Sequence, residues 1–129
     1  MKLYLAGPMR GYPEFNFPAF HAAAAWLRAQ GHQVFSPAEN DLKREGEGFD
    51  KRNAEGNVDK AMKGGFSLRT ALAEDLEFIC REAEGIALLP GWEASSGATA
   101  EHATSKALDH CVIFVPKWVV GFNGRTKAV

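Results

Sequence analysis

Two carboxylic acids and one phenol stand where acid–base or nucleophilic chemistry is possible. Glu101 follows the small residues 98–100 in a segment with helical character, and a carboxylate there can act as a nucleophile or a base. Asp75 lies at the edge of the apolar stripe of another expected helix, so it either reaches the strand ends or points to solvent. Tyr4 stands in a short apolar run, where a buried phenol needs a partner such as a carboxylate. The alternative is a solvated Glu101 and a purely structural Tyr4.

A glycine-containing loop follows the apolar run of Tyr4. Residues 7–11 read Gly-Pro-Met-Arg-Gly. Gly7 and Gly11 permit close backbone approach, and Arg10 beside Met9 has a guanidinium that can clamp a phosphate. The alternative is that these glycines only form a turn.

A second loop suited to anions precedes the helix of Glu101. Ser95, Ser96 and Gly97 lie at its expected start, where free N–H groups and the helix dipole attract negative charge. The competing interpretation is that a serine only caps the helix. Neither G-x-G-x-x-G nor G-K-[ST] occurs in the chain, which argues against NAD and ATP chemistry.

The order of apolar segments predicts an α/β fold. Short apolar runs closed by Gly or Pro indicate buried strands, and apolar residues spaced by three and four indicate helices. Their alternation is typical of a three-layer parallel sheet of about four to five strands with helices on both faces, Rossmann-like or flavodoxin-like, in which ligands bind at the carboxyl ends of the strands. The expected strands are 3–6, 33–36, 86–89 and 111–115, and the expected helices are 16–30, 68–83 and 98–108.

The chain of 129 residues is expected to form a single domain, 1–129, with one unusual segment. Residues 41–66 are rich in charges and contain five glycines, so we expect a mobile insertion there. A segment of this length is either a lid or binding loop or plain disorder.

Composition argues against several classes of protein. The net charge of -1 lacks the basic excess of nucleic-acid binding. Cys80 and Cys111 stand in apolar runs and are expected to be inert core thiols, and the four histidines have no zinc-ligand spacing, so we expect neither metal nor cofactor. No apolar run approaches the ~20 residues of a membrane span. A cytoplasmic protein without membrane association is expected.

Three motifs, taken together, resemble the nucleoside 2-deoxyribosyltransferase superfamily. They are Tyr-Leu-Ala-Gly-Pro-Met-Arg-Gly at 4–11, Asp-Leu-Glu-Phe-Ile at 75–79 and Ser-Ser-Gly-Ala-Thr-Ala-Glu at 95–101. The resemblance covers residues 1–115 and is strongest to the 2'-deoxynucleoside 5'-monophosphate N-hydrolase branch and its small bacterial and phage relatives. It implies a homodimer or larger homo-oligomer that acts on a nucleotide.

The resemblance also implies roles for individual residues. Glu101 would be the nucleophile, Asp75 would act near the leaving base, and Tyr4 would orient Glu101. The transferases usually carry an aspartate six residues before the nucleophile, where this chain has Ser95. With the Arg10–Gly11 pair of the hydrolase loop, this serine implies that Gly7, Met9, Arg10, Gly11, Ser95 and Gly97 hold a 5'-phosphate.

The chain departs from the family pattern in three places. Pro8 and Met9 replace more polar residues, Glu84 replaces the usual aspartate before the third strand, and the segment 41–66 is larger and more charged than expected.

The expected function is hydrolysis of the base–sugar bond of a nucleoside 5'-monophosphate through a glutamate nucleophile. The alternatives are transfer of deoxyribose between bases, a non-catalytic nucleotide-binding module, and a structural flavodoxin-like domain. Trp92, Trp118 and Phe122 are candidates for a subunit interface or for base stacking.

Overall fold

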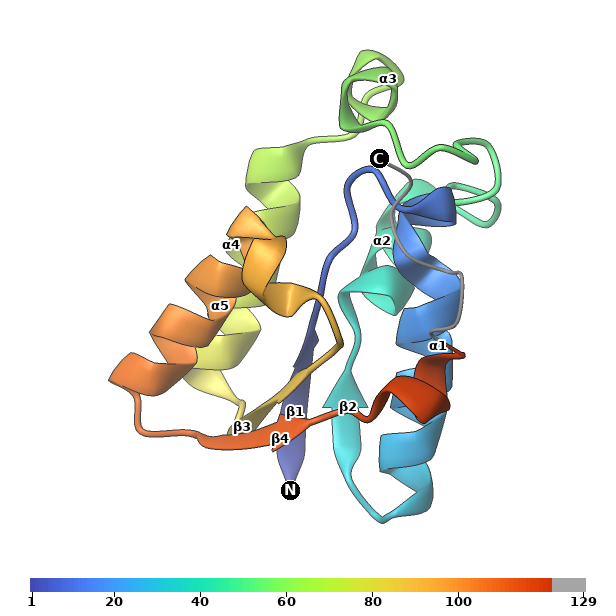
Figure 1. Cartoon of the computed structure of the whole chain (residues 1–129). Coiled ribbons are helices and arrows are strands. Elements are labelled where there is room, and N and C mark those ends of the chain that lie inside the picture. Colours follow the sequence, from blue (N-terminus) through green and yellow to red (C-terminus); the bar gives the residue numbers. More distant parts are fainter. Residues whose placement is uncertain (122–129) are drawn as a thin grey trace.

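Four parallel strands form the centre of the molecule, whose computed structural model describes residues 1–121 (Figure 1). Their order in the sheet is β2-β1-β3-β4, so β1 lies between β2 and β3. This confirms the predicted parallel α/β sheet. The strands are β1 (Lys2–Ala6), β2 (Gln33–Phe35), β3 (Gly85–Leu88) and β4 (Cys111–Phe114).

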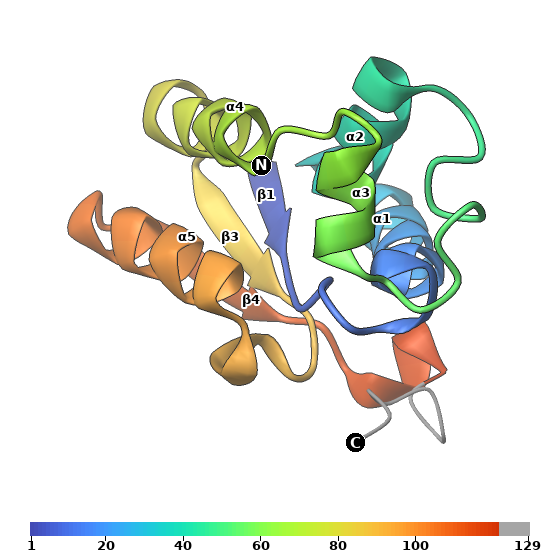
Figure 2. The same ribbon diagram turned by 90° about the horizontal axis from the view of Figure 1, so that it is seen from above.

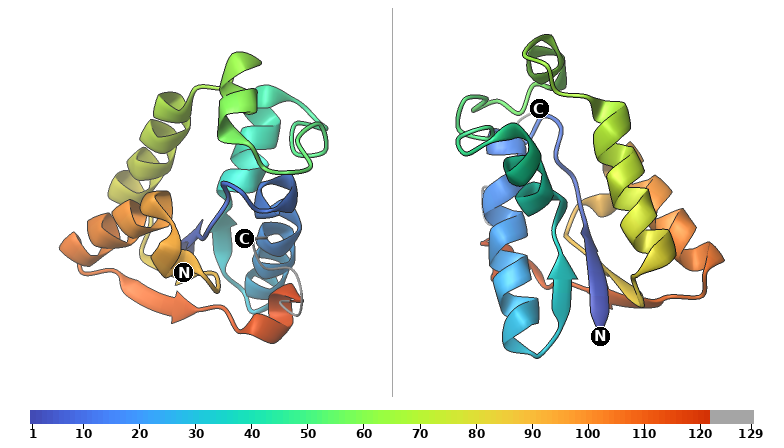
Figure 3. Two further views of the ribbon diagram at one scale, coloured as in Figure 1. Left: turned by 45° about the horizontal axis from the view of Figure 1, so that its top comes forward. Right: turned by 180° about the vertical axis from the view of Figure 1, so that it is seen from behind.

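Helices cover both faces of the sheet, which completes the three predicted layers. Seen from above, α1 and α2 lie on one side of the strands and α4 and α5 on the other (Figure 2). The short helix α3 lies above the carboxyl end of β1, on the side of α1 and α2 (Figures 1 and 3). The helices are α1 (Phe17–Ala29), α2 (Pro37–Glu45), α3 (Val58–Lys63), α4 (Leu68–Arg81) and α5 (Ser96–Ala107), with short 3-10 turns at Pro13–Asn16, Trp92–Ala94 and Lys117–Val120.

Alternation along β1 divides the core into two parts. Leu3 and Leu5 point toward α1 and join a large apolar cluster that includes Phe20; we call this side the α1 face. Tyr4 and Ala6 point the other way, toward α4 and α5, and join a smaller cluster; we call this side the α4/α5 face. Both faces of the central strand are therefore buried, as a parallel sheet requires.

The segment 41–66 differs from the expected mobile insertion, because it contains the end of α2 and all of α3. Phe49, Asp50 and Asn53 are buried. The Asn53 side chain bonds the backbone N–H and C=O of Asn57 at 2.9 and 2.7 Å, which satisfies the turn before α3. Buried aromatic packing and these local hydrogen bonds order a stretch whose composition predicted otherwise.

The same segment is tied to the loop that follows β1. The Gly11 N–H donates to the Gly56 C=O at 2.8 Å, and the Glu14 N–H donates to the Ala54 C=O at 3.0 Å. A Cβ on Gly56 would lie 2.1 Å from the Tyr12 carbonyl oxygen, so only glycine permits this close approach. The segment thus forms a fixed roof beside the loop of Met9 and Arg10.

The two cysteines correct another expectation, since Cys80 and Cys111 are both exposed rather than core thiols. Cys80 lies beside the buried Ile79 but on the outer side of α4, and Cys111 begins the edge strand β4. An apolar run on an edge strand is not fully covered, and Phe114 in β4 is likewise exposed. Within residues 1–121, no helix is long and apolar enough to cross a membrane.

Candidate functional site

A cavity of about 290 Å³ opens where the strand order reverses between β1 and β3. The loop after β1 leads to α1 on one face and the loop after β3 leads to α5 on the other, so the two loops diverge and leave a crevice at the carboxyl ends. The lining residues come from β1, from both loops, from three helices and from the segment 46–66. They are Tyr4, Gly7, Pro8, Met9, Arg10, Tyr12, Phe15, Pro37, Asp41, Phe49, Val58, Phe66, Leu68, Ala71, Leu72, Asp75, Ala94, Ser95, Ser96, Gly97, Ala98 and Glu101.

Tyr4 and Glu101 meet at the floor of this cavity. Tyr4 lies in the middle of β1 and is fully buried, and Glu101 lies in the second turn of α5 and is 6% exposed. The Tyr4 hydroxyl donates a hydrogen bond of 2.7 Å to Oε2 of Glu101. The predicted partner of the buried phenol is therefore confirmed, and Glu101 is not a solvated helix residue.

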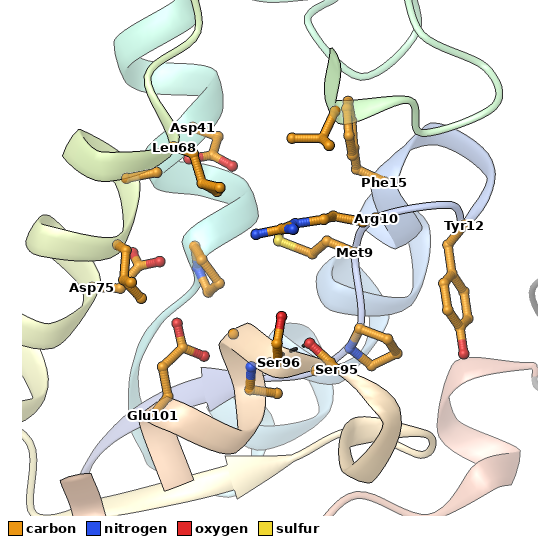
Figure 4. Close-up of a pocket in the computed structure, with 18 of the residues that line it drawn as sticks. Met9, Arg10, Tyr12, Phe15, Asp41, Leu68, Asp75, Ser95, Ser96 and Glu101 are labelled. Atoms are coloured by element: carbon orange, nitrogen blue, oxygen red, sulfur yellow. Dashed lines mark hydrogen bonds between the residues drawn. The ribbon is translucent and has the colours of Figure 1, made fainter. Parts of the chain in front are cut away.

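Asp75 lies on the same side of the cavity as Glu101 (Figure 4). It is 7% exposed, and its position four residues after Ala71 and four before Ile79 places it on the buried line of α4. Its Oδ1 has no hydrogen-bond partner among the described residues. A buried oxygen without a hydrogen-bond partner costs free energy unless it is protonated or contacts a ligand. Asp75 is therefore a candidate for direct contact with a ligand in the cavity.

Electrostatics in this cluster favour protonated carboxyls. Burial raises the pKa of Asp75 to about 7, and the negative charge of Asp41 adds to the shift. Burial and the charge of Asp75 likewise raise the pKa of Glu101, whereas the hydrogen bond from Tyr4 opposes this shift. Burial also raises the pKa of Tyr4, which keeps the phenol a donor. Because two adjacent buried carboxylates repel each other, Glu101 and Asp75 are best satisfied when they share one proton.

The opposite part of the cavity is polar and contains the start of α5. Ser95 Oγ accepts the N–H of Ala98 at 3.2 Å, so the predicted helix cap is confirmed. Ser96 and Gly97 also line the cavity, and N–H groups in the first turn of a helix have no partner within the helix. The exposed side chain of Arg10 extends across the cavity toward its centre (Figure 4). A cation, a helix start and two hydroxyls therefore face one space.

The three other residues predicted for the phosphate loop have different surroundings. Met9 and Gly7 line the cavity. A Cβ on Gly7 would lie 2.6 Å from Cβ of Leu89, so Gly7 is needed for packing between the ends of β1 and β3. Gly11 does not line the cavity, and its N–H is already bonded to Gly56. The structure thus does not bring Gly11 to the site.

Sequence reasoning missed Asp41 and the aromatic roof. Asp41 was counted among the charges of an insertion, but it is buried in α2 and lines the cavity. Burial raises its pKa to about 6, against the opposing hydrogen bond from Arg44. Its place in the helix that begins at the carboxyl end of the second strand was the signal that could have found it. Phe49 and Phe66 had no such signal, because their roles depend on tertiary packing.

Other predicted residues lie elsewhere or beyond the described part. Trp92 packs against His102, and Trp118, 73% exposed, packs edge-on against Trp26; neither lines the cavity. Phe122 lies outside residues 1–121. In that described range, no group of three His, Cys, Asp or Glu side chains is arranged to hold a metal ion.

The fold and the cavity define the class to which this chain belongs: an α/β domain of Rossmann-like or flavodoxin-like layout with a pocket at its topological switch point. Within this class the chain belongs to the family DUF4406, a domain of unknown function, which matches residues 1–114. No curated protein and no solved structure matches the chain.

Proposed function

We propose that this protein is an N-glycosidase that hydrolyses the base–sugar bond of a nucleoside 5'-monophosphate. The observation that supports this proposal most directly is the buried Glu101 carboxyl, held by Tyr4 at 2.7 Å and accompanied by Asp75 in one cavity. The motif resemblance to the nucleoside 2-deoxyribosyltransferase superfamily assigns the same three residues to catalysis.

The reaction needs a negative group at the anomeric carbon. Breaking an N-glycosidic bond develops positive charge on the sugar, and an ionised carboxylate in a low-dielectric pocket stabilises that charge. Glu101 attacks the anomeric carbon, the bond to the base nitrogen breaks, and its electron pair leaves with the base. The product of this step is a glycosyl ester on Glu101.

The second carboxyl handles the protons. Protonated Asp75 donates to the departing base nitrogen, and its carboxylate then accepts a proton from the water that attacks the ester and frees Glu101. The hydrogen bond from Tyr4 supports the ionised form of Glu101, although the same phenol also lowers the pKa of Asp75. A base nitrogen beside the unpartnered Oδ1 of Asp75 would draw the shared proton to that oxygen and leave Glu101 ionised. Because the pKa values of both carboxyls are raised, that of Asp75 to about 7, both groups are protonated at low pH, and base release should rise as the pH increases through about 7 and the pair loses its first proton.

The polar end of the cavity suits the 5'-phosphate. Arg10, the Ser96 hydroxyl and the first turn of α5 supply positive charge and donors, and Ser95 stands where the transferases usually carry an aspartate. An aspartate there would repel a phosphate, so the serine favours a charged substrate over an unphosphorylated nucleoside.

The test is chromatographic measurement of free base from a panel of ribo- and deoxynucleoside monophosphates and the matching nucleosides, at pH 6 and pH 8, with and without a second free base. We expect release from monophosphates, faster at pH 8 than at pH 6, with water as the acceptor. A new nucleotide containing the added base would instead show a transferase. Absence of release from every compound would contradict the proposal.

A further inference from the structure

We propose that Asp41 determines which nucleobase the cavity accepts, by accepting a hydrogen bond from the exocyclic amino group of cytosine or adenine. This inference rests on the proposed function, because it takes the ligand of the cavity to be a nucleotide. It concerns a residue that the catalytic steps above do not use.

The position of Asp41 along the cavity is the first argument. In Figure 4, Asp41 and Leu68 lie at the end opposite Ser95 and Ser96, and Asp75 lies between Asp41 and Glu101. A nucleotide with its phosphate at the serines and its anomeric carbon at Glu101 must extend its base past Asp75. The far edge of the base then arrives at Asp41.

The surroundings of Asp41 suit a flat aromatic ring. Leu68, at the start of α4, lies beside this carboxyl (Figure 4). Phe66 and Phe49 of the ordered roof line the same cavity, and the Phe66 ring lies 5.8 Å from the guanidinium of Arg44, the hydrogen-bond partner of Asp41. Apolar walls with a single polar group at one edge are the usual composition of a site that fixes the orientation of a ring. Here that polar group is a carboxylate.

The carboxylate is held in place but only partly used. Arg44 donates to Oδ1 of Asp41 at 2.6 Å, and the same guanidinium is fixed by Glu45 at 2.7 Å and by Glu74. Among residues 1–121, no other side chain is bonded to the Asp41 carboxylate, so Oδ2 is left for a ligand. A positioned oxygen with a vacant lone pair provides directional recognition.

The chemistry of the bases gives the direction of the preference. Cytosine and adenine present an amino donor at the position where uracil and hypoxanthine present a carbonyl acceptor. A carboxylate accepts a hydrogen bond from the amino group. Against a carbonyl it forms no hydrogen bond, because both oxygens are acceptors and neither carries a proton. In a buried site, such a mismatch leaves polar groups unpaired and costs at least about tenfold in affinity.

The test compares dissociation constants for cytidine and uridine monophosphates, and for adenosine and inosine monophosphates, in the deoxy and the ribo series. Calorimetry in a Glu101→Gln background prevents turnover. We expect at least about tenfold tighter binding of the amino member of a pair. Asp41→Asn should abolish or invert this preference, because the amide can donate to a carbonyl.

Glu45→Gln is the control variant. It alters the same arginine and removes one negative charge from the same helix, but Glu45 does not line the cavity. This variant should keep the preference, which separates recognition by Asp41 from a disturbance of Arg44. Thermal melting of both variants reports whether they fold. If a variant does not fold, the binding preference measured with Asp41 intact still tests the proposal.

The outcomes distinguish this inference from the proposed function. Equal binding within each pair, preference for the carbonyl members, an unchanged preference in Asp41→Asn, or no nucleotide binding at all would overturn the role of Asp41. Selective binding without release of any base by the wild-type protein would support the role of Asp41 and contradict the glycosidase. Release of all bases with equal efficiency would support the glycosidase and contradict the role of Asp41.

Discussion

The two faces of the central sheet share strand β1 but differ in what they bury. The α1 face contains Leu3, Leu5 and Phe20 in a large apolar cluster. The α4/α5 face buries a phenol and two carboxyls beside a smaller cluster. Apolar burial stabilises the fold, whereas burial of an ionisable group costs free energy unless the group is neutral or paired. The comparison teaches that one face supplies the stability that allows the other to keep reactive groups out of water.

The largest effect on stability is expected from the α1 face. Phe20→Ala removes a fully buried ring from the large cluster and should lower the free energy of unfolding by about 3–5 kcal/mol. Urea denaturation measures this change. A loss below about 1 kcal/mol would mean that this face is not the main source of stability.

Asp75→Asn on the other face should have the opposite sign. The folded-state pKa of Asp75, about 7, lies above the unfolded value of about 3.9, so the folded protein binds more protons between these values and loses stability as the pH rises through them. The neutral amide removes this loss of stability at high pH. A pKa difference of about three units corresponds to no more than about 4 kcal/mol.

Denaturation at two pH values tests this sign. Asp75→Asn should be more stable than wild type at pH 8 and nearly equal to it at pH 4, while its base release is strongly reduced. A variant that is less stable at pH 8 would show that Asp75 is a structural group, and the contrast between the two faces would then fail.

The smallest expected effect on stability comes from replacing a helix-capping serine, and it tests whether Ser95 also contacts the ligand. Ser95 and Ser67 cap α5 and α4 in the same way, each accepting an N–H from three residues later at 3.2 and 3.1 Å. Replacing either by alanine should cost about 1 kcal/mol of stability. Only Ser95→Ala should also raise KM for a monophosphate, since Ser67 does not line the cavity. Equal KM values in steady-state assays would leave Ser95 as a cap alone.

The same contrast explains what could be predicted from sequence. The strands and the helices α1 and α4 follow from the local pattern of apolar residues, and α5 follows from the capping residues that precede it. The pairing of Tyr4 with a carboxylate follows from the needs of a buried phenol. Composition misjudged the segment 41–66, because the order there comes from tertiary contacts such as Phe49 packing and the Gly11–Gly56 hydrogen bond. Asp41 was missed for a different reason: its segment was assigned to an insertion, although it lies in the helix that begins where the second strand ends.

The most direct test of the central claim is the rate of base release by Glu101→Gln, measured beside wild type on the best nucleoside monophosphate of the panel. The amide retains the shape of the side chain and an oxygen that can accept from Tyr4, so the variant should fold, but it cannot stabilise or capture a sugar cation. We expect release to fall by about 10³-fold or more. Release at the wild-type rate in a folded Glu101→Gln protein would contradict the assignment of Glu101 as the nucleophile.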